Sequence, residues 1–156
     1  MLKYYSDVNL KEIREAKNYG ELLFVAIEVL QTMREESFLK PIAMLCGPIS
    51  TGGSGSRSTN LEVFGRAIER ASADGLFVFS QMPFENDMGR IYKSDPALQG
   101  LRLLEEFYRP IFELGFVNLL CFLPGWENSV GATWEHEQAE KLNIPRIYLS
   151  DYYTKD

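Results

Sequence analysis

A single carboxylate, Glu135, occupies an otherwise apolar helical stripe. From Ser129 onward the pattern is helical, and Ala132, Glu135, Ala139 and Leu142 recur at the spacing of one helix face. The sequence therefore predicts an inward carboxylate near a helix start, which could act as a nucleophile or general base. The alternative is a solvated carboxylate at the edge of the stripe.

A loop rich in glycine and serine, residues 47–58, precedes another predicted helix. Small residues let the backbone approach an anion closely, and a helix N-terminus favours negative charge. The guanidinium of Arg57 and the loop hydroxyls could add to such a site; the hydroxyls are those of Ser50, Thr51, Ser54 and Ser56. The alternative is a flexible surface turn. The Gly-Lys-Ser/Thr ending of a P-loop is absent.

Four further side chains could position a ligand near these groups. Ser129 precedes the Glu135 helix, where it could cap the helix, donate to a phosphate, or do both. Trp126, Phe84 and Met82 could enclose a flat base, although such aromatic side chains could equally belong to the core.

Strand and helix patterns alternate after residue 40. Apolar runs predict four strands, over residues 41–46, 76–79, 116–123 and 145–149. Helices are predicted between them, and 80–94 is expected to be an irregular loop. This alternation predicts an α/β fold with an all-parallel sheet in the order 2-1-3-4, and right-handed crossovers place helices on both of its faces.

The predicted helices begin and end at recognisable signals. Thr59 and Glu62 form a capping-box pattern. Asp95-Pro96 is a typical helix start, and Pro110 is expected to kink the helix that follows. Asn9 is predicted to cap a first N-terminal helix, and Gly20 to separate it from a second.

The second N-terminal helix has an unusually wide apolar surface. Leu23, Phe24 and Ile27 extend the stripe beyond one face, which predicts a homodimer or larger homo-oligomer. The alternative is that this helix is buried within its own subunit. We expect one domain over residues 1–156, with a helical extension over 1–40 and a nucleotide-binding core over 41–150.

The predicted fold gathers the unusual loops at one place. Ligands of open parallel sheets bind beyond the carboxyl ends of the strands, at the topological switch point. The loops over 47–58, 80–94 and 124–129 all follow strands, so we expect them to border one crevice.

Composition limits the possible functions. The chain has 156 residues and a net charge of -6, which argues against broad nucleic-acid binding. No apolar run is long enough to span a membrane, and no signal peptide is apparent. Cys46 and Cys121 lie in apolar runs and are predicted to be buried thiols, which suggests a cytoplasmic location. With His136 as the one histidine, neither a metal site nor a cofactor is predicted.

Three sequence elements together carry a family resemblance. They are Gly47-Pro48-Ile49, an Asn60 four residues before Phe64, and the run from Leu123 to Ala139. This pattern resembles the nucleoside 2-deoxyribosyltransferase-like superfamily and is close to its DUF4406 type, over about residues 41–150.

The resemblance implies a flavodoxin-like fold and chemistry at an N-glycosidic bond. The residue at the position of Glu135 attacks the anomeric carbon in that superfamily, and water or a second base completes the reaction. Ser129, Gly131 and Glu135 match the spacing of relatives that hydrolyse nucleoside 5′-monophosphates. A hydroxyl can donate to a phosphate, whereas a carboxylate would repel it. A nucleotide or nucleoside is therefore the expected partner.

The resemblance also implies a set of site residues. Those expected to bind the substrate and its phosphate are Gly47, Pro48, Ile49, Ser50, Arg57, Asn128, Ser129 and Gly131. Those expected around the base are Met82, Phe84 and Trp126. The candidates for an acid are Glu85 and Asp87, with Asp95 a further one. A neighbouring subunit often completes such sites, and the tail with Asp151, Tyr152 and Tyr153 could do so. The alternative function is a non-catalytic module that binds or senses a nucleotide or nucleotide-sugar.

Overall fold

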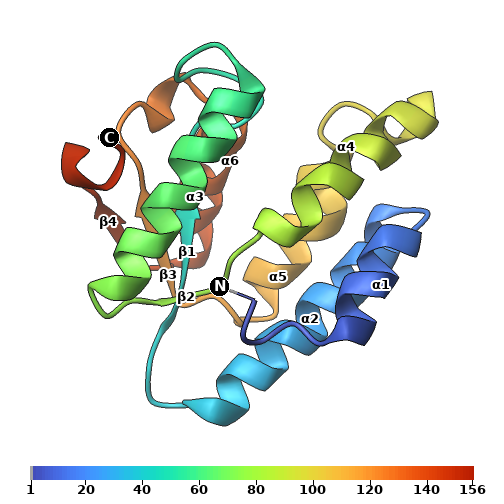
Figure 1. The fold of residues 1–156 in the computed structure, drawn as a ribbon, viewed down its shortest axis with the longest axis horizontal. Helices are drawn as coiled ribbons and strands as arrows, with labels where there is room; N and C mark the ends of the chain where they lie inside the picture. The colour runs from blue at the N-terminus through green and yellow to red at the C-terminus, as the bar shows by residue number, and fades with distance from the viewer. Residues whose placement is uncertain (1) are drawn as a thin grey trace. The chain divides into compact units, whose positions relative to one another are not determined.

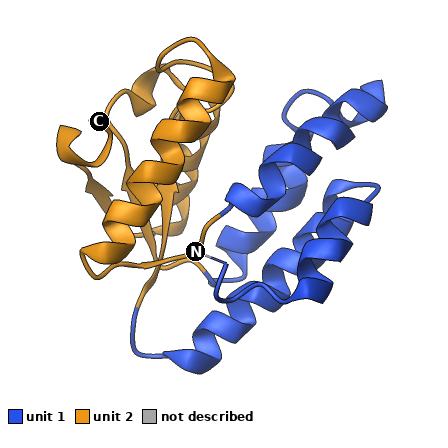
Figure 2. Ribbon diagram, viewed as in Figure 1, with its two compact units in different colours: residues 1–40, 81–116 blue, residues 41–80, 117–156 orange. Residues whose placement is uncertain are grey.

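The chain forms two compact units, each built from two separate stretches of sequence. The computed structural model describes residues 2–156. Unit 1 combines residues 1–40 with 81–116, and unit 2 combines 41–80 with 117–156 (Figure 2). Residues 81–116 thus group with the N-terminal helices and not with the sheet. The division into an extension and a core at residue 40 stays a prediction.

Unit 2 is a flavodoxin-like, three-layer α/β/α unit around a parallel sheet, as predicted. The strand order is β2-β1-β3-β4, and every neighbouring pair is parallel. Helices α3 and α6 cover opposite faces of the sheet, with α3 in front in Figure 1. The elements are β1 (Ile42–Cys46), α3 (Arg57–Ala73), β2 (Phe77–Val78), β3 (Leu119–Phe122), α6 (Val130–Leu142) and β4 (Arg146–Tyr148).

The position of each strand in the sheet explains how deeply its residues are buried. All five residues of β1 are buried, as expected for a central strand covered on both faces. The edge strand β4 instead leaves its three residues exposed. Register is fixed by Leu45 opposite Cys121 and by Cys121 opposite Ile147. Both cysteines are buried free thiols, which confirms their predicted place in the core.

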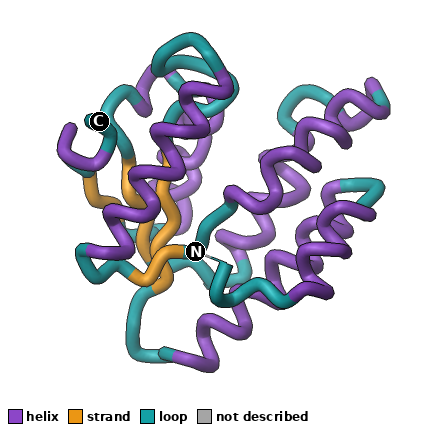
Figure 3. The backbone as a smooth tube through the Cα atoms, in the orientation of Figure 1, coloured by secondary structure: helices purple, strands orange, loops and turns teal. Residues whose placement is uncertain are grey.

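The described part of unit 1, residues 2–40 and 81–116, is helical and holds no strand, as the tube drawing in Figure 3 shows. Helix α1 packs against α2, and α2 packs against a π-helical turn. Inside this unit the Phe84 ring contacts the rings of Tyr5 and Phe107. Its elements are α1 (Asp7–Glu15), α2 (Tyr19–Glu36), α4 (Glu85–Ser94), the π-helical turn (Leu104–Tyr108) and α5 (Arg109–Glu113).

The prediction of an irregular loop over residues 80–94 is wrong, because most of this segment is helical. A 3-10 turn over Met82–Phe84 leads directly into α4. Phe84, Met88 and Ile91 are buried at helical spacing, and this apolar face explains the helix. The polar residues around Pro83 conceal that periodicity in the sequence.

The structure also differs from the prediction that a helix begins at Asp95. Asp95 caps only a 3-10 turn over Pro96–Leu98, where its carboxylate accepts a hydrogen bond from the Ala97 amide at 2.9 Å. The irregularity near Pro110 takes the form of the π-helical turn that ends at Tyr108. Proline offers no N–H for a helical hydrogen bond, so a wider turn beside it is physically reasonable.

Three predicted helix starts are displaced by a few residues. The N-cap of α1 is Ser6, and Asn9 completes its capping box from inside the helix. Asn18 caps α2, so Gly20 lies within that helix and does not precede it. Ser56 caps α3, three residues before the predicted Thr59.

The wide apolar surface of α2 is only partly used within the chain. Phe24 is 63% exposed, while Leu23 and Ile27 are partly buried. Association of chains through this surface stays a prediction. Among residues 2–156, no helix has both the length and the apolar character needed to cross a membrane.

Candidate active site at the carboxyl edge of the sheet

The residues of the candidate site in unit 2 lie where β1 and β3 end. The loop over 47–56 follows β1, and the turn over 124–129 follows β3. The Leu123 amide donates to Cys46 O at 2.9 Å, so the two strands stay paired until the loops begin. Trp126 to Asn128 then form a 3-10 turn, entered through Gly125 at a φ of 84°. Both predicted loops therefore start from one sheet edge.

Asn60 organises the glycine- and serine-rich loop from inside. This side chain is 4% exposed. Its amide nitrogen donates to Ile49 O at 2.9 Å and to Gly52 O at 3.2 Å. Its amide oxygen accepts from the Ser54 N–H at 3.0 Å and from the Ser54 hydroxyl at 2.9 Å. These bonds give the loop one defined course, which does not fit a flexible surface turn.

The loop also lies tightly against the turn after β3. A Cβ atom on Gly47 would come within 2.9 Å of a Leu123 methyl carbon. One on Gly52, whose φ is +73°, would come within 2.6 Å of the Asn128 carbonyl oxygen. Glycine is therefore required at both positions by close approach, and at Gly52 also by a left-handed backbone.

The first turn of α6 is capped by two hydroxyl groups. Ser129 Oγ accepts a hydrogen bond from the Ala132 amide at 3.2 Å, so the predicted capping role is confirmed. Thr51 Oγ1, from the loop, accepts from the Val130 amide at 2.9 Å. The Ser129 hydroxyl also lies 3.5 Å from Gly47 O. An anion binding to the Val130 or Ala132 amide would have to displace one of these hydroxyls.

The remaining predicted phosphate-binding residues surround this junction. Pro48 is buried, and Ser50 and Asn128 are exposed. Arg57 is partly buried in the first turn of α3, and Gly131 lies in the first turn of α6. The structure therefore brings the loop, Ser129 and Gly131 to one end of unit 2.

Glu135 is buried, as its place on the stripe predicts. Its exposure is 7%, beside 1% for Ala132 and 0% for Ala139. Leu142 departs from the prediction, because it is 39% exposed at the end of α6. The polar residues Glu137 and Glu140 are exposed. Glu135 is thus a carboxylate held against the sheet, not a solvated group at the edge of the stripe.

The thiol of Cys46 lies beside the Glu135 carboxylate. Burial raises the pKa of Cys46 well above its ordinary value, and the charge of Glu135 and a hydrogen bond to it act in the same direction. The thiol therefore stays protonated and can donate to the carboxylate. Sequence reasoning placed Cys46 only in the core, since an apolar strand gives no signal of this contact.

Trp126 belongs to an aromatic cluster at the same end of unit 2. Its ring stacks on His136 with centroids 4.4 Å apart and an interplanar angle of 14°. His136 Nε2 lies 2.7 Å from the Tyr148 hydroxyl, and His136 Nδ1 lies 3.1 Å from a Glu140 carboxylate oxygen. One face of the Trp126 indole is therefore covered by the chain itself.

The other predicted base and acid residues belong to unit 1. Phe84 is fully buried between Tyr5 and Phe107, which gives its ring a place in the core. Met82 is partly buried, and Glu85 is buried at the start of α4.

Asp87 and Asp95 have structural partners in unit 1. Asp87 Oδ1 accepts from Arg90 Nε at 2.9 Å, and Arg90 also donates to Arg14 O on α1 at 3.2 Å. Asp95 caps the 3-10 turn described above.

The C-terminal tail is held by α3 of its own chain. Arg66 donates to Thr154 O at 3.0 Å, and Arg70 donates to Tyr152 O at 2.6 Å. The Tyr153 hydroxyl donates to Asp74 at 2.9 Å. Asp151 begins the 3-10 turn that carries these residues. Completion of a neighbouring subunit's site by this tail stays a prediction.

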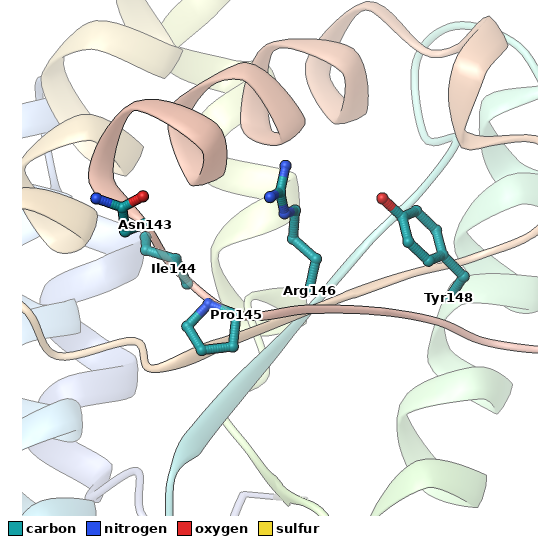
Figure 4. Close-up of a pocket in the computed structure, with 5 residues that line it drawn as sticks. All are labelled: Asn143, Ile144, Pro145, Arg146 and Tyr148. Carbon is teal, nitrogen blue, oxygen red and sulfur yellow. The ribbon is translucent and has the colours of Figure 1, made fainter.

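A separate groove of about 450 Å³ runs between the end of α6 and β4. Arg146 and Tyr148 point from the strand toward the helix (Figure 4). Arg146 Nη1 is 3.5 Å from a Glu140 carboxylate oxygen, so its charge is partly compensated. None of the predicted site residues lines the groove, whose walls are Asn143, Ile144, Pro145, Arg146 and Tyr148.

Within residues 2–156, no group of three or more histidine, cysteine, aspartate or glutamate side chains could hold a metal ion. Searches of family models, of curated proteins and of solved structures each returned no match to this chain. The resemblance to the deoxyribosyltransferase-like superfamily therefore stays a prediction that rests on the motif residues.

Proposed function

We propose that this protein cleaves the N-glycosidic bond of a nucleoside 5′-monophosphate, with Glu135 as the nucleophile. The observation that carries the proposal is the position of Glu135. It is a buried carboxylate on the helix that starts at the carboxyl edge of a parallel sheet, where such folds bind ligands. Burying a carboxylate is costly, so its presence on this stripe favours a functional role.

The proposed reaction has two displacement steps. A Glu135 oxygen attacks the anomeric carbon, the bond from that carbon to the base nitrogen breaks, and the base leaves with a proton from a general acid. Water then attacks the same carbon and releases the sugar phosphate and the free carboxylate. Splitting the displacement in this way lowers the barrier of each step.

The capped loop supports the choice of a monophosphate. Thr51 and Ser129 place hydroxyl groups at the start of α6, and no carboxylate takes either capping position. Hydroxyls that now accept from backbone amides can rotate to donate to an anion that replaces them. Because Asn60 fixes the course of the loop, the cost of ordering it on binding is small.

The test is release of free base from a panel of ribo- and deoxyribonucleoside monophosphates, followed by chromatography. Glu135→Gln keeps the shape of the side chain and removes its charge, so we expect base release to be lost. Glu137→Gln is the matched control, because Glu137 is exposed on the same helix. Retention of activity within about tenfold of wild type, about 1.4 kcal/mol of barrier, would exclude Glu135 as the nucleophile.

A non-catalytic nucleotide-binding module is the second candidate. The observation that favours it is the low exposure of Glu135, 7%, together with its contact to Cys46. A carboxylate held in this way could serve only to shape the core. Wild-type protein that releases no base, yet melts at a higher temperature with a monophosphate present, would favour this function.

A further inference from the structure

Three polar side chains of unit 2 form a hydrogen-bonded chain that the proposed glycosidase reaction does not use. Glu140 Oε1 lies 3.1 Å from His136 Nδ1, and His136 Nε2 lies 2.7 Å from the Tyr148 hydroxyl. Glu140 follows His136 by one turn on the same face of α6, and Tyr148 ends β4. A carboxylate, an imidazole and a hydroxyl in this order are the parts of an activated nucleophile.

The carboxylate of Glu140 decides which nitrogen of the imidazole carries the proton. An ionised carboxylate can only accept a hydrogen bond, so Nδ1 is the nitrogen that donates. In the neutral ring Nε2 then holds a lone pair, and the Tyr148 hydroxyl donates to it. His136 is therefore oriented as a base toward the phenol of Tyr148.

Aromatic rings hold the imidazole in this orientation. The Trp126 ring stacks on it with centroids 4.4 Å apart, and the Phe122 ring lies in a T-shaped arrangement with centroids 5.0 Å apart. The side chain of His136 is only 16% exposed, whereas Tyr148 is 58% exposed. The base is thus shielded from water, while the nucleophile stays open to a ligand.

The groove between α6 and β4 can hold that ligand. Its volume of about 450 Å³ suits a small molecule, and Tyr148 is one of its walls. Arg146 and Tyr148 lie on one face of the strand and both point toward α6 (Figure 4). Arg146 meets Glu140 through Nη1, and other N–H groups of the guanidinium can stabilise an oxygen that becomes negative. Ile144 and Pro145 add an apolar wall for the rest of the ligand.

We propose that this groove is a second reactive site, in which Tyr148 is a nucleophile toward an activated acyl donor. His136 is its general base, and Glu140 is a positioning residue that fixes the imidazole. The phenol oxygen attacks the acyl carbon and its proton passes to His136 Nε2. The bond from the acyl carbon to the leaving group then breaks, and the leaving group takes the proton from the imidazole.

The chemistry of the phenol limits the donor. Phenolate is itself a good leaving group, so the donor must carry one at least as good, as in an aryl ester, a thioester or an acyl phosphate. Water then attacks the acyl–tyrosine ester while His136 takes the proton of the water and returns it to the Tyr148 oxygen. The net reaction is hydrolysis of the donor.

The first test uses phenylmethylsulfonyl fluoride, which tyrosine attacks with loss of fluoride to give a stable product. Peptide mass spectrometry gives the labelling rate of each tyrosine in one sample. Tyr152 is the matched control, because it is 57% exposed in the same unit and lies beside Arg70 instead of a histidine. We expect Tyr148 to be labelled at least about a hundredfold faster than Tyr152, which is the contribution of a general base. A smaller difference would overturn the proposal.

Substitutions separate base catalysis from simple exposure. His136→Gln keeps a polar side chain but removes the base, and Glu140→Gln leaves the tautomer unfixed. Each should slow the labelling of Tyr148 by about tenfold or more. Glu137→Gln, at an exposed position on the same helix, should not. Labelling near the wild-type rate in either of the first two variants would overturn the proposal.

Nitrogen NMR of the imidazole reads the tautomer without any electrophile. His136 is the one histidine of the chain, so the signals report on it alone. In the neutral ring of wild type we expect the proton on Nδ1, and in Glu140→Gln a shift of the proton toward Nε2. A carboxylate with only a structural role would leave the tautomer unchanged. A proton on Nε2 in wild type would also overturn the proposal, since that nitrogen could not accept from Tyr148.

The closing experiment measures turnover of p-nitrophenyl acetate, an aryl ester small enough for the groove. Wild type should release nitrophenol about tenfold or more faster than Tyr148→Phe, and sulfonylation of Tyr148 should remove the difference. Equal release by the two proteins would overturn the acyl-transfer step. No nucleotide is present, so the outcome is independent of the proposed glycosidase function.

Discussion

The buried side-chain amide of Asn60 holds the loop after β1 in one conformation. Its four hydrogen bonds join three points of the loop to the start of α3. Most side-chain hydrogen bonds in proteins go to backbone groups or to water, and Asn60 makes all four of these bonds within one loop. The candidate phosphate site therefore depends on a residue that need not touch a ligand.

Asn60→Ala should destabilise the protein by about 2 to 3 kcal/mol, because it leaves buried carbonyl and amide groups of the loop without partners. Urea denaturation would measure the loss. Asn128→Ala is the control, since Asn128 is exposed in the neighbouring turn, and it should change stability by less than about 0.5 kcal/mol. Equal effects of the two substitutions would contradict the role of Asn60.

Individual residues also show where prediction from sequence works. The inward position of Glu135 follows from a spacing that any α-helix imposes, and the capping role of Ser129 follows from residue type. The contacts of Cys46, Thr51 and Asn60 join segments distant in sequence, and no local pattern encodes them. Asn60 had one available signal, its place in the family motif, but that signal did not indicate its role.

The loop after β1 is the element on which the candidate site depends. It takes left-handed backbone angles at Gly52, Gly53 and Gly55, with φ values of 73°, 59° and 84°. A Cβ atom would collide with neighbouring atoms at Gly52 and Gly53 but not at Gly55. The energetic cost of the left-handed backbone can therefore be measured apart from the cost of a steric collision.

Gly52→Ala and Gly55→Ala separate these two costs. A Cβ on Gly55 has no atom within 4 Å, so Gly55→Ala should cost about 1 kcal/mol from its positive φ alone. Gly52→Ala should cost about 3 kcal/mol, because its Cβ would also collide with the Asn128 carbonyl, 2.6 Å away. Urea midpoints of both variants would measure the difference. Similar losses would show that the loop moves freely away from the turn.

At this scale the sequence predicted the sheet better than the helices around it. Four apolar runs alternating with helices predicted an all-parallel sheet in the order 2-1-3-4, which the structure confirms. The prediction of a loop over residues 80–94 failed because α4 buries only a narrow face. The proline and the polar side chains of this segment are typical of a loop. Tertiary packing in unit 1 decides its conformation.

The whole molecule carries buried acidic groups that ionise only when it unfolds. Burial raises the pKa of the Cys121 thiol to about 12, and burial raises the pKa of the Tyr5 hydroxyl even further. In the unfolded chain a thiol ionises near about 8.5. Above that pH the unfolded state loses protons that the folded state keeps, so stability should fall as the pH rises toward the folded pKa.

Cys121→Ala should flatten this alkaline loss of stability. Between pH 8 and pH 10, one buried thiol accounts for about 2 kcal/mol of the fall in the free energy of unfolding. The variant should be less stable than wild type at pH 8, because it leaves a cavity, but should lose about 2 kcal/mol less by pH 10. Parallel pH profiles for the two proteins would refute the assignment.

The division into units has a consequence for the order in which a ribosome delivers the chain. Unit 1 needs residues 1–40 and 81–116, so α1 and α2 emerge long before their partners. At 5–20 residues per second, about 4 to 15 s pass between synthesis of residue 40 and of residue 116. During that interval the apolar face of α2 has no partner from residues 81–116 to pack against. The neighbouring strand of β1, β3, is also not yet synthesised. The nascent chain therefore exposes the apolar face of α2 for longest midway through its translation.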